Sequence, residues 1–238
     1  MNHIQAIQTL IDENKRAVQK YGVTRRSMER DTLINALLDY VHGRERRLSE
    51  LETDRLKYPY ITRLFSFYDA PIQNLVPYSN ISLRVLYDAI RNDHYRERTE
   101  ALRAITDEKE ARRFKAANFD YVTFSGAFTK RDASCLVDHS NMLVVDFDHV
   151  EDIPALKQRL FRDEYFVTLL MFRSPSGDGL KWVIPIDTAQ HPHDVWFRSI
   201  SAYIEHSYGI KADSSGSDIA RACFLCYDPE CYINPILL

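Results

Sequence analysis

Two aspartates end an apolar run in the stretch "MLVVDFDHV", residues 142–150. Asp146 and Asp148 are separated by Phe147, so in a strand both carboxylates point to one face, about 7 Å apart along the backbone. Carboxylates at this spacing repel each other in an empty site, and divalent cations with oxygen ligands remove that repulsion. The spacing therefore predicts a metal-binding strand end; the alternative is a polar strand end with two solvated aspartates.

A third carboxylate is expected from the segment "KADSSGSDIAR", which follows a predicted helix. Asp213 is the favoured ligand because it follows the apolar residue Ile210 and precedes the "SSGS" loop, whereas Asp218 is the alternative. Three such carboxylates can hold a pair of Mg²⁺ or Mn²⁺ ions, which activate a 3′-hydroxyl and stabilise a leaving pyrophosphate. Arg221 is expected to contact a phosphate or a template strand, or to neutralise Asp213 or Asp218.

The loop "RSPSGDGLK" contains small and basic residues suited to a triphosphate. The expected nucleotide-binding residues in it are Ser174, Ser176, Gly177, Gly179 and Lys181. Small side chains let backbone amides approach an anion closely, and the lysine adds a point charge. The spacing does not match a Walker A motif. A β-hairpin turn would also explain the glycines, through positive φ angles, but not a lysine that enters a strand beside two aspartates.

The apolar pattern from residue 142 onward predicts the elements that must position these motifs. The expected elements are a strand at 142–148, a helix at 151–164, strands at 166–172 and 180–186, a helix at 193–208 and a last strand at 219–227. This β-α-β-β-α-β order is typical of a ferredoxin-like unit, an α+β fold. Because its first strand ends beside the starts of the third and fourth strands, the three motifs are expected to meet at one edge of the sheet.

The N-terminal part is expected to form a separate helical region. Residues 1 to about 57 show helical periodicity, with an outer face rich in arginine and glutamate that is typical of a solvated helix. Ser82 is predicted to cap a further helix, and "YVTFSG" at 121–126 is read as an additional strand. We therefore expect a helical N-terminal region at 1–80 and a core domain at 81–238.

The composition indicates an intracellular, cytoplasmic protein without a membrane segment. The net charge is −3, and neither a long apolar run nor a signal-peptide core is present. At this net charge, any contact with nucleic acid must come from a local basic patch. Zinc is not expected: Cys223, Cys226 and Cys231 lack a clear fourth ligand, and the first two would point to opposite faces of a strand.

The segments "VVDFD", "SPSGDGLK" and "GIKADSSGSDIARACFLCYDPECYIN" together resemble the archaeo-eukaryotic primase, or primase-polymerase, superfamily. They resemble in particular the branch often fused to helicase modules of the VirE type. The resemblance covers roughly residues 82–235 and implies an RRM-like catalytic core. It also implies that Asp146 and Asp148 form the first acidic motif and that Asp213 forms the third.

The same resemblance assigns roles to two basic residues. Lys181 stands where the superfamily usually has a histidine that touches the incoming nucleotide, and Arg221 matches the arginine that follows the third motif. A lysine can bind a phosphate but cannot act as a neutral imidazole does. This departure puts catalytic rate and nucleotide choice in question.

The resemblance implies a DNA primase or primase-polymerase core that performs template-directed nucleotidyl transfer. Its expected partners are a single-stranded DNA template, nucleoside triphosphates and a helicase on the same or a separate chain. Two other classes stay open. A non-catalytic module that binds nucleotide or single-stranded nucleic acid is compatible with the missing histidine, and a metal-dependent phosphoesterase or nuclease would use the same carboxylates to activate water.

Overall fold

The computed structural model describes residues 12, 15–16, 19–20 and 62–238. The helical prediction for residues 1 to about 57 lies mostly outside the described residues; the five described residues within it are helical and exposed. The chain divides into two compact units, Met1–Tyr58 and Pro59–Leu238. The second unit therefore begins before the boundary expected between residues 80 and 81.

The first sheet of the second unit has four strands in the order β2-β1-β3-β9. These strands are β1 (Phe65–Tyr68), β2 (Ser79–Ile81), β3 (Tyr121–Thr123) and β9 (Cys223–Phe224). Each neighbouring pair is antiparallel. Since β1 pairs directly with β3, the segment before residue 81 belongs to the same sheet as the strand read from "YVTFSG".

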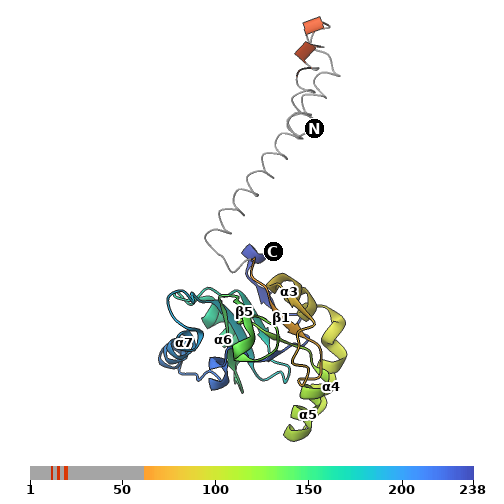
Figure 1. Ribbon diagram of the computed structural model, residues 1–238, viewed down its shortest axis with the longest axis vertical. Coiled ribbons are helices and arrows are strands. Elements are labelled where there is room, and N and C mark those ends of the chain that lie inside the picture. The colour runs from red at the N-terminus through yellow and green to blue at the C-terminus, as the bar shows by residue number, and fades with distance from the viewer. Residues whose placement is uncertain (1–11, 13–14, 17–18, 21–61) are drawn as a thin grey trace. The chain divides into compact units, whose positions relative to one another are not determined.

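Three helices lie between β2 and β3, at one side of this unit in Figure 1. They are α3 (Leu83–Arg91), α4 (Arg96–Ala104) and α5 (Glu108–Asn118), with a short 3-10 helix, η2 (Asp93–Tyr95), before α4. As predicted, Ser82 caps α3, because its side chain accepts a hydrogen bond from the Val85 amide. Asp107 caps α5 in the same way through the Glu110 amide, so α5 begins at a position set by its own sequence.

A two-stranded hairpin leads from the first sheet to the second. It consists of β4 (Gly126–Phe128) and β5 (Leu136–His139), joined through the 3-10 helix η3 (Ala133–Cys135). Gly126 is required where β4 pairs with β5, since a Cβ atom there would lie 2.2 Å from the Asp138 carbonyl oxygen.

The second sheet contains the split β-α-β unit. Its elements are β6 (Met142–Phe147), α6 (Ile153–Phe161), β7 (Leu170–Arg173), β8 (Leu180–Pro185), α7 (His193–Tyr208) and β10 (Tyr232–Ile233). The strand order is β10-β7-β8-β6, and β8 is antiparallel to both β6 and β7. The first five elements of the predicted order, β-α-β-β-α, are therefore confirmed within an α+β fold of antiparallel sheets.

The predicted last strand at 219–227 is wrong. Only Cys223–Phe224 in this range forms a strand, β9, and it pairs with β3 of the first sheet rather than with β6. The polar residues after Asp213 form a 3-10 helix, η4 (Ser214–Ser217), which precedes β9. A backbone hydrogen bond of 2.8 Å from the Asp213 amide to the Asp146 carbonyl oxygen still links this segment to β6.

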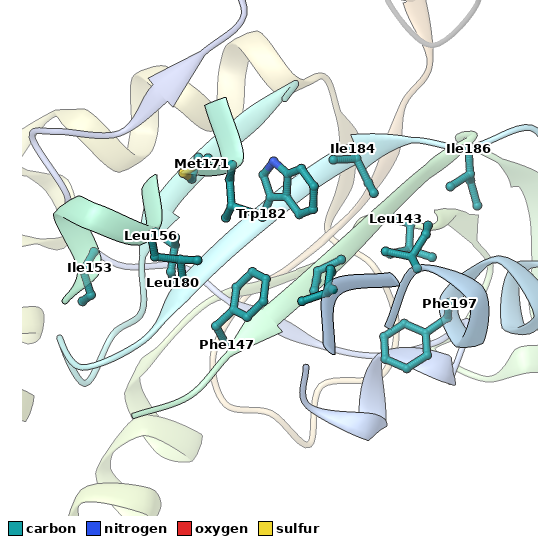
Figure 2. Packing of buried hydrophobic residues seen from close by; sticks show 14 residues of the cluster. Leu143, Phe147, Ile153, Leu156, Met171, Leu180, Trp182, Ile184, Ile186 and Phe197 are labelled. Atoms are coloured by element: carbon teal, nitrogen blue, oxygen red, sulfur yellow. The ribbon is translucent and has the colours of Figure 1, made fainter. Parts of the chain in front are cut away.

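The core of the second sheet explains which way its aspartates point. Leu143, Val145 and Phe147 pack with α6 and α7 on one face of the sheet, and Trp182 of β8 is fully buried among them (Figure 2). Because side chains alternate along a strand, Asp146 lies on the opposite face. Within the described part of the chain, no helix is long and apolar enough to cross a membrane.

Candidate functional site

A pocket of about 630 Å³ opens beside β6, β8 and β9. Most of the residues singled out from the sequence line it: Asp146, Asp148, Ser174, Ser176, Lys181, Asp213, Asp218 and Arg221. They come from the strand end, the glycine-containing loop and the segment around η4, which are far apart in the sequence. The structure thus brings the three motifs together, even though the expected fourth strand does not form. The volume of the pocket is in the range of small-molecule binding sites.

Lys181 and Asp146 form an ion pair in the lining of the pocket. They face each other directly in the register of β6 and β8, and the Lys181 ammonium donates to Asp146 Oδ2. Lys181 is only 6% exposed. The ammonium group of Lys181 is therefore neutralised by Asp146, whereas it was expected from the sequence to bind a triphosphate.

The electrostatic balance keeps Lys181 protonated. Burial lowers its pKa, but neighbouring Cys223, Asp146 and Asp148 raise it by more, so the net shift is upward. Burial also raises the pKa of Cys223 to about 11. The Cys223 thiol is thus uncharged at neutral pH, and the attraction then comes from the aspartates.

Asp213 is held by its own segment. Its carboxylate accepts hydrogen bonds from the Ser215 amide and hydroxyl, and Arg221 Nη2 donates to Asp213 Oδ2 at 3.1 Å. Burial raises the pKa of Asp213, but the bonds from Ser215 and the charge of Arg221 lower it by more. Of the roles considered for Arg221, the structure shows neutralisation of Asp213. Asp218 also lines the pocket and accepts from the Ala220 amide at 2.9 Å.

The carboxylates of Asp146 and Asp148 are better suited to bind a hard cation than that of Asp213. Asp146 Oδ1 is buried without a hydrogen-bond partner in the described part of the chain. Burial, followed by the charge of Asp146, raises the pKa of Asp148. Among the described residues no group of three histidine, cysteine, aspartate or glutamate side chains is arranged to hold one ion. Asp146 Oδ1 and the Asp148 carboxylate are thus the groups that could hold a divalent ion, whereas the Asp213 carboxylate is bonded to Ser215 and Arg221.

The glycine-containing loop is a closed turn. The Ser174 amide donates to the Gly179 carbonyl oxygen at 2.9 Å, and the Gly179 amide donates back to Ser174 Oγ at 3.0 Å. The Gly177 amide donates to the Ser174 carbonyl oxygen at 3.0 Å, and Gly177 has a φ of 88°. Both glycine amides are therefore used inside the turn, and of this loop's predicted small residues Ser174 and Ser176 line the pocket.

Residues outside the loop fix it to the strand end. Arg103 of α4 donates to the carbonyl oxygens of Ser174 and Pro175, at 3.3 and 3.1 Å. On the other side, His149 has a φ of 53°, and its Nδ1 lies 2.7 Å from an Asp178 carboxylate oxygen. The turn after β6 is thus tied to the loop that precedes β8.

One wall of the pocket was not predicted from the sequence. It contains Lys115 from α5, Arg131 from the loop after β4, Phe224 from β9 and the apolar residue Ile72. No local spacing marks them, because they belong to elements that come together only through the first sheet. A signal was present only in the composition of "RRFKAA" and "TKRD", which is common on protein surfaces.

Two histidines, His139 and His193, are hydrogen-bonded to each other, and His193 contacts η4, which follows Asp213. The Asn141 amide donates to His139 Nδ1 at 2.9 Å, so His139 carries its proton on Nε2 and donates to His193 Nδ1 at 3.2 Å. His193 Nε2 then donates to the carbonyl oxygen of Gly216 in η4 at 3.3 Å. Both rings are neutral in this chain of hydrogen bonds.

The histidine pair predicts a loss of stability at acidic pH. Burial and the nearby His193 lower the pKa of His139 from 6.5 to about 4. The unfolded chain takes up this proton near pH 6.5 and the folded chain only near pH 4, so the free energy of unfolding falls as the pH drops through this window. Between pH 7 and pH 5 the fall is on the order of 2 kcal/mol. Urea unfolding at pH 7 and pH 5 measures this fall in stability.

The fall should be smaller in His139→Gln. It should be unchanged in His206→Gln, which alters an exposed histidine of α7. An equal fall in wild type and both variants would contradict the role of His139.

The fold and the pocket together define an α+β protein with a mixed-charge pocket between an acidic strand end and a basic wall. The chain belongs to the family described as BT4734-like, N-terminal domain, whose model matches residues 113–233. The matched range runs from α5 to β10 and so includes the carboxylates, Lys181 and most of the basic wall. No curated protein and no solved structure matches the chain significantly.

Proposed function

We propose that this chain is a nucleotidyltransferase core of the primase-polymerase class, acting in template-directed DNA synthesis. The observation that carries the proposal is the convergence of Asp146, Asp148 and Asp213 with basic side chains in one pocket of small-molecule size. The resemblance of the three motifs to archaeo-eukaryotic primases supports it. The split β-α-β unit is compatible with the RRM-like core of that superfamily, with the fourth strand displaced to the first sheet.

In this proposal the 3′-hydroxyl of a primer attacks the α-phosphate of a nucleoside triphosphate, and pyrophosphate leaves. Asp146 and Asp148 would hold Mg²⁺ or Mn²⁺, which supplies positive charge beside the phosphates. The residues of the chain position the reactants: Lys181 fixes Asp146, and Arg221 fixes Asp213 beside β6. A single-stranded DNA template and a helicase partner belong to the same proposal.

A non-catalytic module that binds nucleotide is the second candidate. Two ion pairs favour it, Lys181 with Asp146 and Arg221 with Asp213. Of the three aspartates Asp146, Asp148 and Asp213, only Asp148 then has no ion pair among the described residues. A metal-dependent nuclease would use the same carboxylates with water as the nucleophile. The three candidates differ in what they do with a primed template and a triphosphate.

Primer extension with Mn²⁺ and labelled nucleotides tests the proposal, and Asp148→Asn is the sharpest variant. Since no ion pair of Asp148 is present among the described residues, the variant removes a charge without breaking one. We expect extension to fall by on the order of 100-fold or more. The control is Asp194→Asn on α7, an aspartate that does not line the pocket and whose ion pair with Arg198 is at the surface, where such pairs contribute little. Wild-type protein that binds nucleotide without extending a primer would favour the binding module, and degradation of DNA without triphosphates would favour the nuclease.

A further inference from the structure

The basic wall of the pocket is built by three segments that lie outside the acidic motifs. Lys115 is on α5, Arg131 follows β4, and Phe224 is on β9. The Lys115 ammonium lies 5.7 Å from the centre of the Phe224 ring, and the Arg131 guanidinium lies 5.0 Å from the centre of the Tyr121 ring. The Phe224 and Tyr121 rings pack edge to face with their centres 6.1 Å apart. Both cations therefore contact the same aromatic cluster.

These two cations differ from the others in the pocket. Lys181 and Arg221 are each neutralised by an aspartate, whereas the side chains of Lys115 and Arg131 form no ion pair or hydrogen bond with any other described residue. Contacts with aromatic rings only partly replace an anionic partner. The wall therefore presents two uncompensated positive charges to the pocket.

The setting of Lys115 strengthens this conclusion. Its side chain is partly buried, and burial together with the positive charge of Lys181 lowers its pKa. Asp148 and Asp146 act in the opposite direction but do not cancel the effect. An anion that enters the pocket beside Lys115 would relieve this unfavourable environment.

We infer that Lys115 and Arg131 bind the phosphate chain of a nucleoside triphosphate, and that Phe224 and Tyr121 position the two cations. This inference rests on the proposed function and changes one part of it, because the sequence analysis gave the phosphates to Lys181. A free triphosphate fits better than a nucleic-acid backbone, since the wall faces a pocket of about 630 Å³ that also contains the carboxylates.

Calorimetric titration of the full chain with inorganic triphosphate and with dATP tests the inference. Mg²⁺ is present, and primer and template are absent, so no turnover occurs. We expect Lys115→Met and Arg131→Met each to weaken the binding of both ligands by about 10-fold or more, the range for charge-assisted hydrogen bonds. Lys109→Met, an exposed lysine on the same helix α5, is the matched control and should bind like wild type.

The outcomes separate this inference from the proposed function. Unchanged triphosphate affinity in both variants, absence of triphosphate binding by wild type, or weakening of single-stranded DNA binding alone would each overturn the inference, even if wild type extends primers. Loss of triphosphate binding in the variants supports it, even if wild type extends no primer. Circular dichroism establishes that each variant is folded, and either variant suffices if the other does not fold.

Discussion

Replacement of Lys181 by methionine is expected to lower the free energy of unfolding by about 3 kcal/mol, the lower end of the range for breaking a buried ion pair. Lys181 is 6% exposed, and its partner Asp146 lies on the adjacent strand at the same register position. Asp146 Oδ1 already has no hydrogen-bond partner among the described residues. The variant therefore leaves the whole carboxylate without compensation while it removes little packing volume.

A double variant distinguishes an unpaired charge from lost packing. In Lys181→Met/Asp146→Leu neither charge remains, so we expect stability to return to within about 1 kcal/mol of wild type. Urea unfolding at pH 7 measures both proteins, and Lys109→Met, which changes an exposed lysine, should alter stability by no more than about 0.5 kcal/mol. If the single variant loses less than the control, or if the double variant is no better than the single one, the ion pair does not stabilise the fold.

Gly179→Ala is expected to cost about 3 kcal/mol, at the upper end of overpacking penalties. A Cβ atom at this position would lie 2.5 Å from the Phe147 carbonyl oxygen and 3.0 Å from Ser174 Oγ. Neither atom can move freely, because the first belongs to β6 and the second accepts the hydrogen bond that closes the loop. The added methyl group would push the loop away from the strand end that bears Asp146.

Gly209→Ala is the matched control for that substitution. Gly209 ends α7 with a φ of 70°, but apart from its neighbours along the chain no atom lies within 4 Å of the position of its Cβ. Its replacement should therefore cost only the penalty of a side chain in the left-handed conformation, about 1–2 kcal/mol. Urea unfolding of both variants measures the difference, and a Gly179→Ala variant no less stable than Gly209→Ala would contradict the close approach.

Lys181 illustrates how a motif can be correctly located and still have an unexpected role. Its place in the strand after the glycine-containing loop follows from the sequence, and it does line the pocket. The expected contact with a phosphate depended on a free ammonium group. The register of β6 and β8 places Asp146 directly opposite, and a buried ammonium pairs with the nearest carboxylate.

What the sequence determined by itself was local. Alternation along 142–148 predicted that Asp146 and Phe147 point to opposite faces, and the structure agrees for these two residues, because the period of a strand is a property of the backbone. Asp148 lies one residue beyond the end of β6. The cap at Ser82 and the β-α-β-β-α order could also be predicted, because helix caps and hydrophobic periods depend on residues close together in the sequence.

Only the tertiary structure decided which strands pair and which side chains share the pocket. Cys223–Phe224 joins β3 rather than β6, and this pairing brings Phe224 beside Lys115 in the pocket that the aspartates also line. Strand pairing between distant segments depends on how whole sheets bury their faces. A strand of two residues is too short to show a periodicity from which its pairing could be predicted. The acidic half of the pocket could therefore be predicted from the sequence, whereas its basic half required the fold.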